Sequence, residues 1–147
     1  MQRTLGFLYL FFLLIACLPC AAEKSNVVVI VADDMGWADV GYHGAPFPTP
    51  NIDALVKQGV ELDQHYVWPT CTPTRVALLT GRYPSRFGCY NPSNERVLPW
   101  ETATLASILG EAGYTTMISG KWHLGSSPEF GPRKFGFDRS YGSLAGG

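Results

Sequence analysis

The sequence carries almost no net charge and has no long apolar run outside its first residues. Its 147 residues have a formal net charge of −1, so no broad basic surface is expected and nucleic-acid binding is not indicated. Charged residues make up 16% of the chain and apolar residues 46%, a balance typical of a globular protein with a packed core. The length corresponds to one domain of ordinary size.

Cysteine is also scarce, with 4 in the whole chain. Cys17 and Cys20 lie in the apolar N-terminal region, which leaves Cys71 and Cys89 for the rest of the protein. Two cysteines do not make a disulfide framework, although they could pair in an oxidising compartment. Because Cys71 belongs to a motif that gives it another use, Cys89 is expected to be free or paired with a residue beyond Gly147.

The first residues have the pattern of an export signal. Arg3 gives a positive start, Leu5–Leu18 is almost wholly apolar but short for a membrane span, and Cys20–Ala22 offers small residues for cleavage. Residues 1–22 are therefore predicted to be a signal peptide. Leu14–Cys17 also resembles a bacterial lipoprotein box, which would leave its cysteine lipidated. A transmembrane anchor is the least favoured of the three interpretations.

The apolar pattern of the remaining chain alternates between strands and helices. Residues 26–32 form a continuous β-branched run, typical of a strand buried on both faces of a parallel sheet. Capping residues, proline and glycine mark the helix ends. We expect strands at residues 26–32, 60–66 and 114–119, and helices from Pro50 to a stop at Gly59, from about Pro73 to Leu79, and from Thr102 to Ala112. This order predicts an α/β fold with a mainly parallel sheet flanked by helices.

Two further expectations concern packing. Leu105, Ile108 and Leu109 share one face of the third helix and should point into the core. Residues 82–99, rich in proline and asparagine, are expected to form a surface loop.

The most informative stretch is Cys71–Arg75 (CTPTR), followed by Leu78–Arg82 (LLTGR). Pro73 suits the first turn of a helix, because its missing N–H would be unpaired there anyway. Cys71 then lies at or just before the positive end of the helix dipole, and Arg75, four residues on, returns to the same face. A reactive side chain, a helix N-terminus and an arginine would converge on a place suited to an oxyanion. A buried or disulfide-bonded cysteine is the alternative.

Asp33 and Asp34 directly follow the first predicted strand. Adjacent carboxylates repel each other unless a cation lies between them. Because no histidine or cysteine accompanies them, their hard oxygen ligands favour Ca²⁺ or Mg²⁺ over zinc. Helix capping and solvated surface charge are the alternatives.

Lys121 and His123 lie two residues apart after the third predicted strand, so in an extended segment they point the same way. A lysine can hold an anionic oxygen as a point charge, and a histidine can hold or move a proton near neutral pH. An exposed lysine and a packed histidine are the alternative. His43 and His65 lie outside these stretches and are assigned to structure or to the rim of a substrate site.

Together these stretches resemble the signatures of the sulfatase family. Cys-x-Pro-x-Arg followed by Leu-x-Thr-Gly-Arg is similar to the family's first signature, and Gly120–Gly125 (GKWHLG) is similar to its second. Asp33–Gly36, Pro50–Leu55 and Gly136–Asp138 are also typical of the family and occur in the same order. The resemblance covers residues 26–147.

The resemblance implies an alkaline phosphatase-like fold and a nucleophile made by oxidation of Cys71 to formylglycine, an aldehyde. It implies that Asp33, Asp34 and the modified Cys71 bind Ca²⁺, with Mg²⁺ as the less favoured ion. The catalytic residues that it implies are Cys71, Arg75, Lys121 and His123. Lys121 and His123 would also bind the substrate, and a maturation enzyme that makes formylglycine is an expected partner.

The activity implied is the hydrolysis of sulfate monoesters of small molecules or carbohydrates by an arylsulfatase-like enzyme. The protein would be secreted or periplasmic, or lipid-anchored if it is processed at Cys17. A phosphonate or phosphate ester hydrolase of the same fold is an alternative, and so is a non-catalytic fragment. Residues 23–147 are expected to be the N-terminal portion of the catalytic domain, because the family's later calcium and leaving-group residues are missing. This fragment alone is expected to be inactive.

Overall fold

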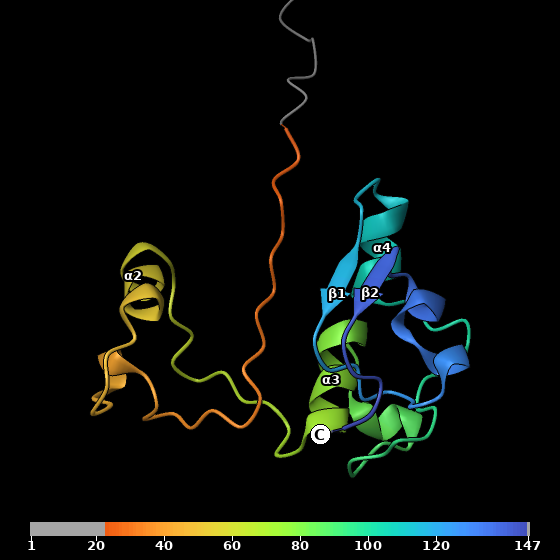
Figure 1. Ribbon diagram of the computed structural model, residues 1–147, viewed down its shortest axis with the longest axis horizontal. Helices are drawn as coiled ribbons and strands as arrows, with labels where there is room; N and C mark the ends of the chain where they lie inside the picture. Colours follow the sequence, from red (N-terminus) through yellow and green to blue (C-terminus); the bar gives the residue numbers. More distant parts are fainter. Residues whose placement is uncertain (1–22, 147) are drawn as a thin grey trace, which may run out of the picture. The chain divides into compact units, whose positions relative to one another are not determined.

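The computed structural model describes residues 23–146, which fall into two units divided between Ala32 and Asp33. The predicted signal peptide at residues 1–22 lies outside the described residues. Within the second unit, Figure 1 shows the helices α3 and α4 and the strands β1 and β2 gathered in one compact part. No helix of the described chain is both long enough and apolar enough to cross a membrane.

Residues 26–32 run extended without forming a strand. Val28 is 80% exposed and Ile30 is 83% exposed. A buried strand needs hydrogen-bonded neighbours for its backbone, and no segment among residues 23–146 pairs with this one. The prediction of a strand at residues 26–32 is therefore wrong for this structure.

The helix α2 spans Pro50–Gln58, with Thr49 before it and Gly59 after it, as the sequence predicted. The Thr49 hydroxyl makes no capping bond to the helix backbone; it donates to the Asp53 carboxylate and accepts from the Gly41 N–H. Residues 60–66, which follow α2, form no strand and are exposed, so that prediction is also wrong. Their alternating pattern suits a half-buried strand, but no described segment lies beside them to complete a sheet.

The compact part contains two α-helices and a pair of parallel strands. The helix α3 spans Cys71–Thr80, and α4 spans Leu105–Glu111. The strand β1, Met117–Ser119, pairs in parallel with β2, Arg139–Tyr141. The parallel pairing agrees with the expected fold class, although β1 is shorter than the segment 114–119 and β2 was not expected. Short 3-10 helices occupy Gly41–His43, Pro84–Phe87, Pro128–Phe130 and Pro132–Phe135.

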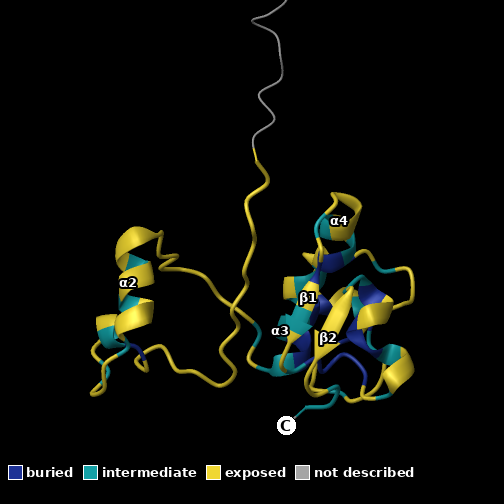
Figure 2. Ribbon diagram, turned by 45° about the horizontal axis from the view of Figure 1, so that its top comes forward, coloured by how far each residue is buried: buried dark blue, intermediate teal, exposed yellow. Residues whose placement is uncertain are grey.

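The hydrophobic core lies in this compact part, whereas α2 is mostly exposed (Figure 2). The buried residues of this hydrophobic core are Val76, Cys89, Leu98, Trp122, Leu124 and Phe135. Cys89 and Leu98 come from residues 82–99, so this segment is part of the core and not only a surface loop. The prediction of which face of α4 is buried is also wrong. Leu105 and Ile108 are 36% and 55% exposed, while Ala106 is buried.

The contact between the two strands continues past their ends. The N–H groups of Gly120 and Trp122 donate to the carbonyls of Tyr141 and Ser143 over 2.9 Å each. The next N–H, that of His123, donates to Leu144 over 3.0 Å. Residues 141–144 therefore hold the backbone of the segment that carries Lys121 and His123.

Candidate active site

The helix α3 places Cys71 at its first position. Thr70 before it is extended, with φ −136° and ψ 157°, and its carbonyl accepts the Thr74 N–H. The helix thus begins two residues before the predicted start, while Pro73 stays in the first turn, where its missing N–H costs nothing. Cys71 is half-buried and its thiol is free, so a disulfide with Cys89 is not formed.

The first turn of α3 is tied to a distant segment through Thr72, a residue that the sequence analysis did not identify. The Thr72 side chain is fully buried, and its hydroxyl accepts the Ser93 N–H over 3.1 Å. The Thr74 hydroxyl donates to the Trp68 carbonyl over 2.8 Å. Both bonds anchor the turn that presents Cys71, and a threonine within a helical motif gives no sequence signal of such a long-range bond.

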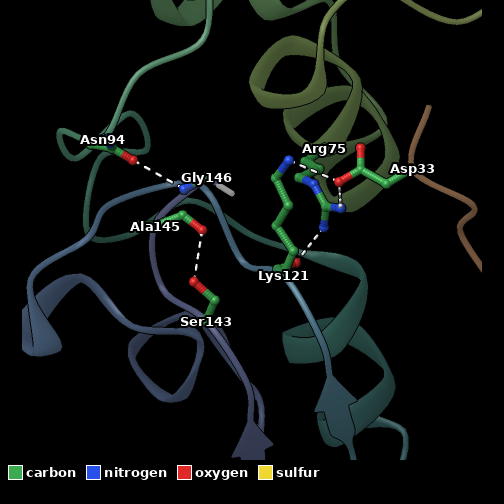
Figure 3. Close-up of polar contacts among 7 residues, drawn as sticks. All are labelled: Asp33, Arg75, Asn94, Lys121, Ser143, Ala145 and Gly146. Atoms are coloured by element: carbon green, nitrogen blue, oxygen red, sulfur yellow. Dashed lines mark hydrogen bonds and ion pairs between the residues drawn. The ribbon is translucent and has the colours of Figure 1, made fainter.

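Asp33, Arg75 and Lys121 form one charged cluster (Figure 3). The Lys121 Nζ lies 2.8 Å from the Asp33 Oδ2, and the Arg75 guanidinium lies 3.6 Å from the same oxygen. Arg75 also donates to the backbone carbonyl of Lys121. Three residues that the sequence singled out separately are therefore brought together.

The cluster shifts the ionisation of its members in the expected directions. The hydrogen bond from Lys121 lowers the pKa of Asp33 despite a desolvation cost, and the charges of Lys121 and Arg75 act in the same direction. The same hydrogen bond raises the pKa of Lys121, and the nearby Cys71 sulfur also raises it. Asp33 is thus anionic and Lys121 cationic at neutral pH. Arg75 on α3 bonds the Lys121 carbonyl and shares the Asp33 carboxylate with the Lys121 ammonium, so Lys121 lies beside this helix.

His123 is buried beside this cluster, with only 5% of its surface exposed. Burial lowers its pKa, and the positive charges of Lys121 and Arg75 lower it further, so the imidazole is neutral at pH 7. Its backbone has φ 58°, a left-handed conformation that is unusual for a residue with a side chain. Such strain persists only where surrounding contacts impose it.

The donor chemistry at Asp33 and Asp34 fits a hard divalent cation, but only as part of a site. Both side chains offer carboxylate oxygens, the ligands that Ca²⁺ and Mg²⁺ prefer, and Asp33 is held ionised. A complete sphere takes about six or more oxygen ligands. Among residues 23–146, no three His, Cys, Asp or Glu side chains group in a way that could hold a metal.

His43, assigned above to structure or to the rim of a substrate site, has a structural environment. Its ring stacks on Trp37 with centroids 3.8 Å apart, and its two nitrogens contact the Trp37 carbonyl and the Glu61 carboxylate at 2.7 and 2.9 Å. His65 is exposed. Neither histidine has a described contact with Asp33, Arg75 or Lys121.

Comparison with known proteins places nearly all of the described chain in one family. Residues 25–147 match the family model named Sulfatase. The chain is 46% identical over 130 residues to arylsulfatase A of Bos taurus, an alignment covering 83% of this chain and 26% of that protein. It is 44% identical over 129 residues to arylsulfatase J of Mus musculus, covering 84% of this chain and 22% of that protein.

Solved structures agree with the sequence comparison. The crystal structure of Ps i-CgsB superposes with a TM-score of 0.73 at 45% identity, covering 80% of this chain and 27% of that one. A sulfatase of Bacteroides thetaiotaomicron, BT33336S-sulf, gives a TM-score of 0.77 at 35% identity, covering 84% and 29%. The fold is therefore the alkaline phosphatase-like α/β fold of these neighbours, and the chain spans about a quarter of the length of the proteins that it matches. With the signature stretches and the charged cluster in place, this chain belongs to the sulfatase family.

Proposed function

We propose that the protein hydrolyses sulfate monoesters through a formylglycine made from Cys71. Sulfatases generally use this modified residue and a divalent metal. The observation that carries the proposal is the convergence at the start of α3. There Cys71 occupies the first helical position, Arg75 follows one turn later, and the Lys121 ammonium shares the Asp33 carboxylate with Arg75. A helix N-terminus with two cations beside it is suited to an anionic ester.

The modified residue supplies the covalent chemistry. As a hydrate, formylglycine would offer one hydroxyl that attacks sulfur while the S–O bond to the alcohol breaks and the alcohol leaves; deprotonation of the second hydroxyl would then expel sulfate as the aldehyde re-forms. The chain's own side chains then bind charge and move protons. Their proposed roles come from the resemblance to sulfatases, and their positions and ionisation states support them.

Arg75 and Lys121 supply the positive charge. The bond from Arg75 to the Lys121 carbonyl and its ion pair with Asp33 fix the guanidinium beside the first turn of α3, where it would hold the ionised nucleophile. The Lys121 side chain is flexible and 22% exposed, so its ammonium can turn from Asp33 to a sulfuryl oxygen. Charge developing on the sulfuryl group would be stabilised by this lysine.

His123 would bind or deprotonate the hydrate. A neutral imidazole at pH 7 can accept a proton, and the lowered pKa of His123 keeps it in that state. Asp33 and Asp34 would contribute carboxylate oxygens to a divalent cation, for which we favour Ca²⁺ over Mg²⁺. The cation would add positive charge next to the sulfate oxygens.

We further propose that the substrate is a sulfated carbohydrate and that the protein is exported. A second crystal structure of Ps i-CgsB holds the protein in complex with k-i-k-neocarrahexaose. The aligned sequence of that structure is 44% identical to this chain. The N-terminal pattern of Arg3 and Leu5–Leu18 supports export of the protein, either as a secreted or as a lipid-anchored form. During export the protein would meet the maturation enzyme that makes formylglycine.

The first test is the mass of the tryptic peptide Gln58–Arg75 from protein exported by a host that matures sulfatases. The expected result is the mass of an aldehyde in place of the thiol at Cys71, while the peptide that contains Cys89 keeps its thiol. The matured full-length protein should then release sulfate from an aryl sulfate faster than it cleaves a phosphonate ester. An unmodified Cys71, in a host shown to mature another sulfatase, would overturn the proposal.

A further inference from the structure

We propose that Asn94 is a positioning residue for the His123 imidazole and that it acts through the backbone of Gly146. The inference rests on the proposed function only for the catalytic role of His123, since the contacts belong to the fold. Asn94 and Gly146 lie 52 residues apart in the sequence, and neither belongs to a signature stretch.

The His123 ring packs directly against Gly146. A Cβ atom at position 146 would lie 2.5 Å from both Cε1 and Nε2 of the imidazole and 3.1 Å from its Cδ2. Real Cβ atoms do not approach other atoms so closely, so only glycine lets the backbone and the ring touch here. The Gly146 backbone is therefore one wall of the space that the imidazole occupies.

Within the described part of the chain, no hydrogen bond at Nδ1 orients this ring. The Nδ1 atom of His123 is buried and has no hydrogen-bond partner among residues 23–146. In many active sites a third group fixes the orientation of a catalytic histidine through this nitrogen. The packing of the Gly146 backbone against Cε1 and Nε2 therefore restrains where the imidazole points.

Asn94 fixes that backbone (Figure 3). Its Oδ1 accepts the Gly146 N–H over 3.1 Å. The backbone carbonyl of Asn94 accepts both the N–H and the hydroxyl of Ser126, over 2.8 and 2.9 Å. Asn94 thus joins the backbone of Gly146 to Ser126 in the segment that follows His123.

The test compares Asn94→Ala with Asn94→Asp and Asn91→Ala in the matured full-length protein. Aspartate keeps an acceptor oxygen for the Gly146 N–H, whereas alanine removes it. Asn91 is exposed in the same loop, and its described contact uses only its backbone carbonyl, which makes it a matched control. Gly146→Ala is a second, independent variant, because its Cβ would push the ring from its place.

Two readouts are needed. The first is the Cε1–Hε1 resonance of His123 in protein labelled with ¹³C-histidine, assigned by its loss in His123→Gln. The second is kcat and KM on an aryl sulfate, with formylglycine content measured in each sample. We expect Asn94→Ala to shift the His123 resonance and to lower kcat about tenfold with KM little changed, because a small misplacement of a catalytic group mainly affects the chemical step.

Asn94→Asp should keep most of kcat and the wild-type resonance, Asn91→Ala should match the wild type, and Gly146→Ala should shift the resonance at least as far as Asn94→Ala. An unchanged His123 resonance in Asn94→Ala would overturn the proposal, as would an equal shift in Asn91→Ala. A wild type that carries the aldehyde but cleaves no sulfate ester would contradict the proposed function alone, because the resonance still tests the role of Asn94.

Discussion

The Lys121 ammonium shares the Asp33 carboxylate with Arg75, which lies on α3. Replacing it in Lys121→Met should lower kcat on an aryl sulfate about 100-fold to 1,000-fold, because one preorganised charge is lost from the transition state. The matched control is Lys134→Met, since Lys134 is exposed and has no described contact with the cluster. Equal activity of the two variants would show that Lys121 does not act on the sulfuryl group.

A second prediction concerns the pKa of His43. Burial lowers this pKa, but the hydrogen bond to the Trp37 carbonyl and the contact with Glu61 outweigh burial, so the pKa is raised above its usual value of 6.5. A raised folded-state pKa contributes stability that is fully present below the unfolded value. That stability is lost as the pH rises through the folded value.

Glu61→Gln should therefore lower the His43 pKa measured by NMR titration. Asp63→Asn should lower it less, because Asp63 is the smallest of the causes that raise it. If Glu61→Gln left the titration curve of His43 in place, the 2.9 Å contact would not be maintained in solution.

At the level of single residues, the sequence predicted which side chains carry the chemistry better than it predicted which residues contact one another. Asp33, Arg75 and Lys121 were each singled out by residue type and local pattern, and the structure brings them together. The bonds made by Thr72 and Asn94 were not predicted, because each reaches across 21 or more residues to a backbone group. A backbone partner has no side-chain identity that a motif could reveal.

Helix ends were easier to predict than strands. Proline and glycine act locally, and they marked the ends of α2 to the residue. Strands depend on distant partners, so the apolar pattern of residues 26–32 and 60–66 predicted strands that the structure does not form. The strand β2 was missed for the same reason, since its three residues are exposed and pair only with β1.

The start of α4 gives a stability prediction. Thr104 and Ser107 form a reciprocal cap, in which each side chain bonds to the other's backbone N–H. The fully buried Thr104 hydroxyl also donates to the Phe135 carbonyl over 2.6 Å. Thr104→Val should lower the free energy of unfolding by about 2 kcal/mol, because it removes the cap and leaves a buried carbonyl without its donor.

Chemical denaturation of the full-length protein measures this loss. Thr115→Val is the matched control, because Thr115 is exposed, and it should change stability little. A Thr104→Val protein as stable as the control would mean that water replaces both bonds at no cost.

At the scale of the whole molecule, the hydrophobic core and the candidate site are built from the same segment of the chain. Trp122 is almost fully buried, and its indole N–H donates to the Phe130 carbonyl over 2.9 Å. Its neighbours in the sequence are Lys121, which points to Asp33, and His123, which packs on Gly146. Burial of this tryptophan therefore fixes the segment on which both polar side chains stand. The sequence showed their spacing, but the packing depends on Cys89 and Leu98, from the segment predicted to be a surface loop, and on Phe135.

The last prediction concerns the 147-residue chain on its own. Among its described residues, only the Asp33 carboxylate contacts Arg75 and Lys121, and no three His, Cys, Asp or Glu side chains group to hold a metal, which is too few oxygens to bind a divalent cation firmly. Without that charge, Arg75 and Lys121 alone would have to stabilise a doubly anionic transition state while remaining paired with Asp33. We therefore expect no measurable release of an aryl alcohol from an aryl sulfate by this chain, even with the aldehyde present at position 71 and calcium in excess. The matured full-length protein, assayed in parallel, is the positive control. Turnover by the short chain that disappears in Cys71→Ala would show that residues 23–147 hold a complete catalytic apparatus.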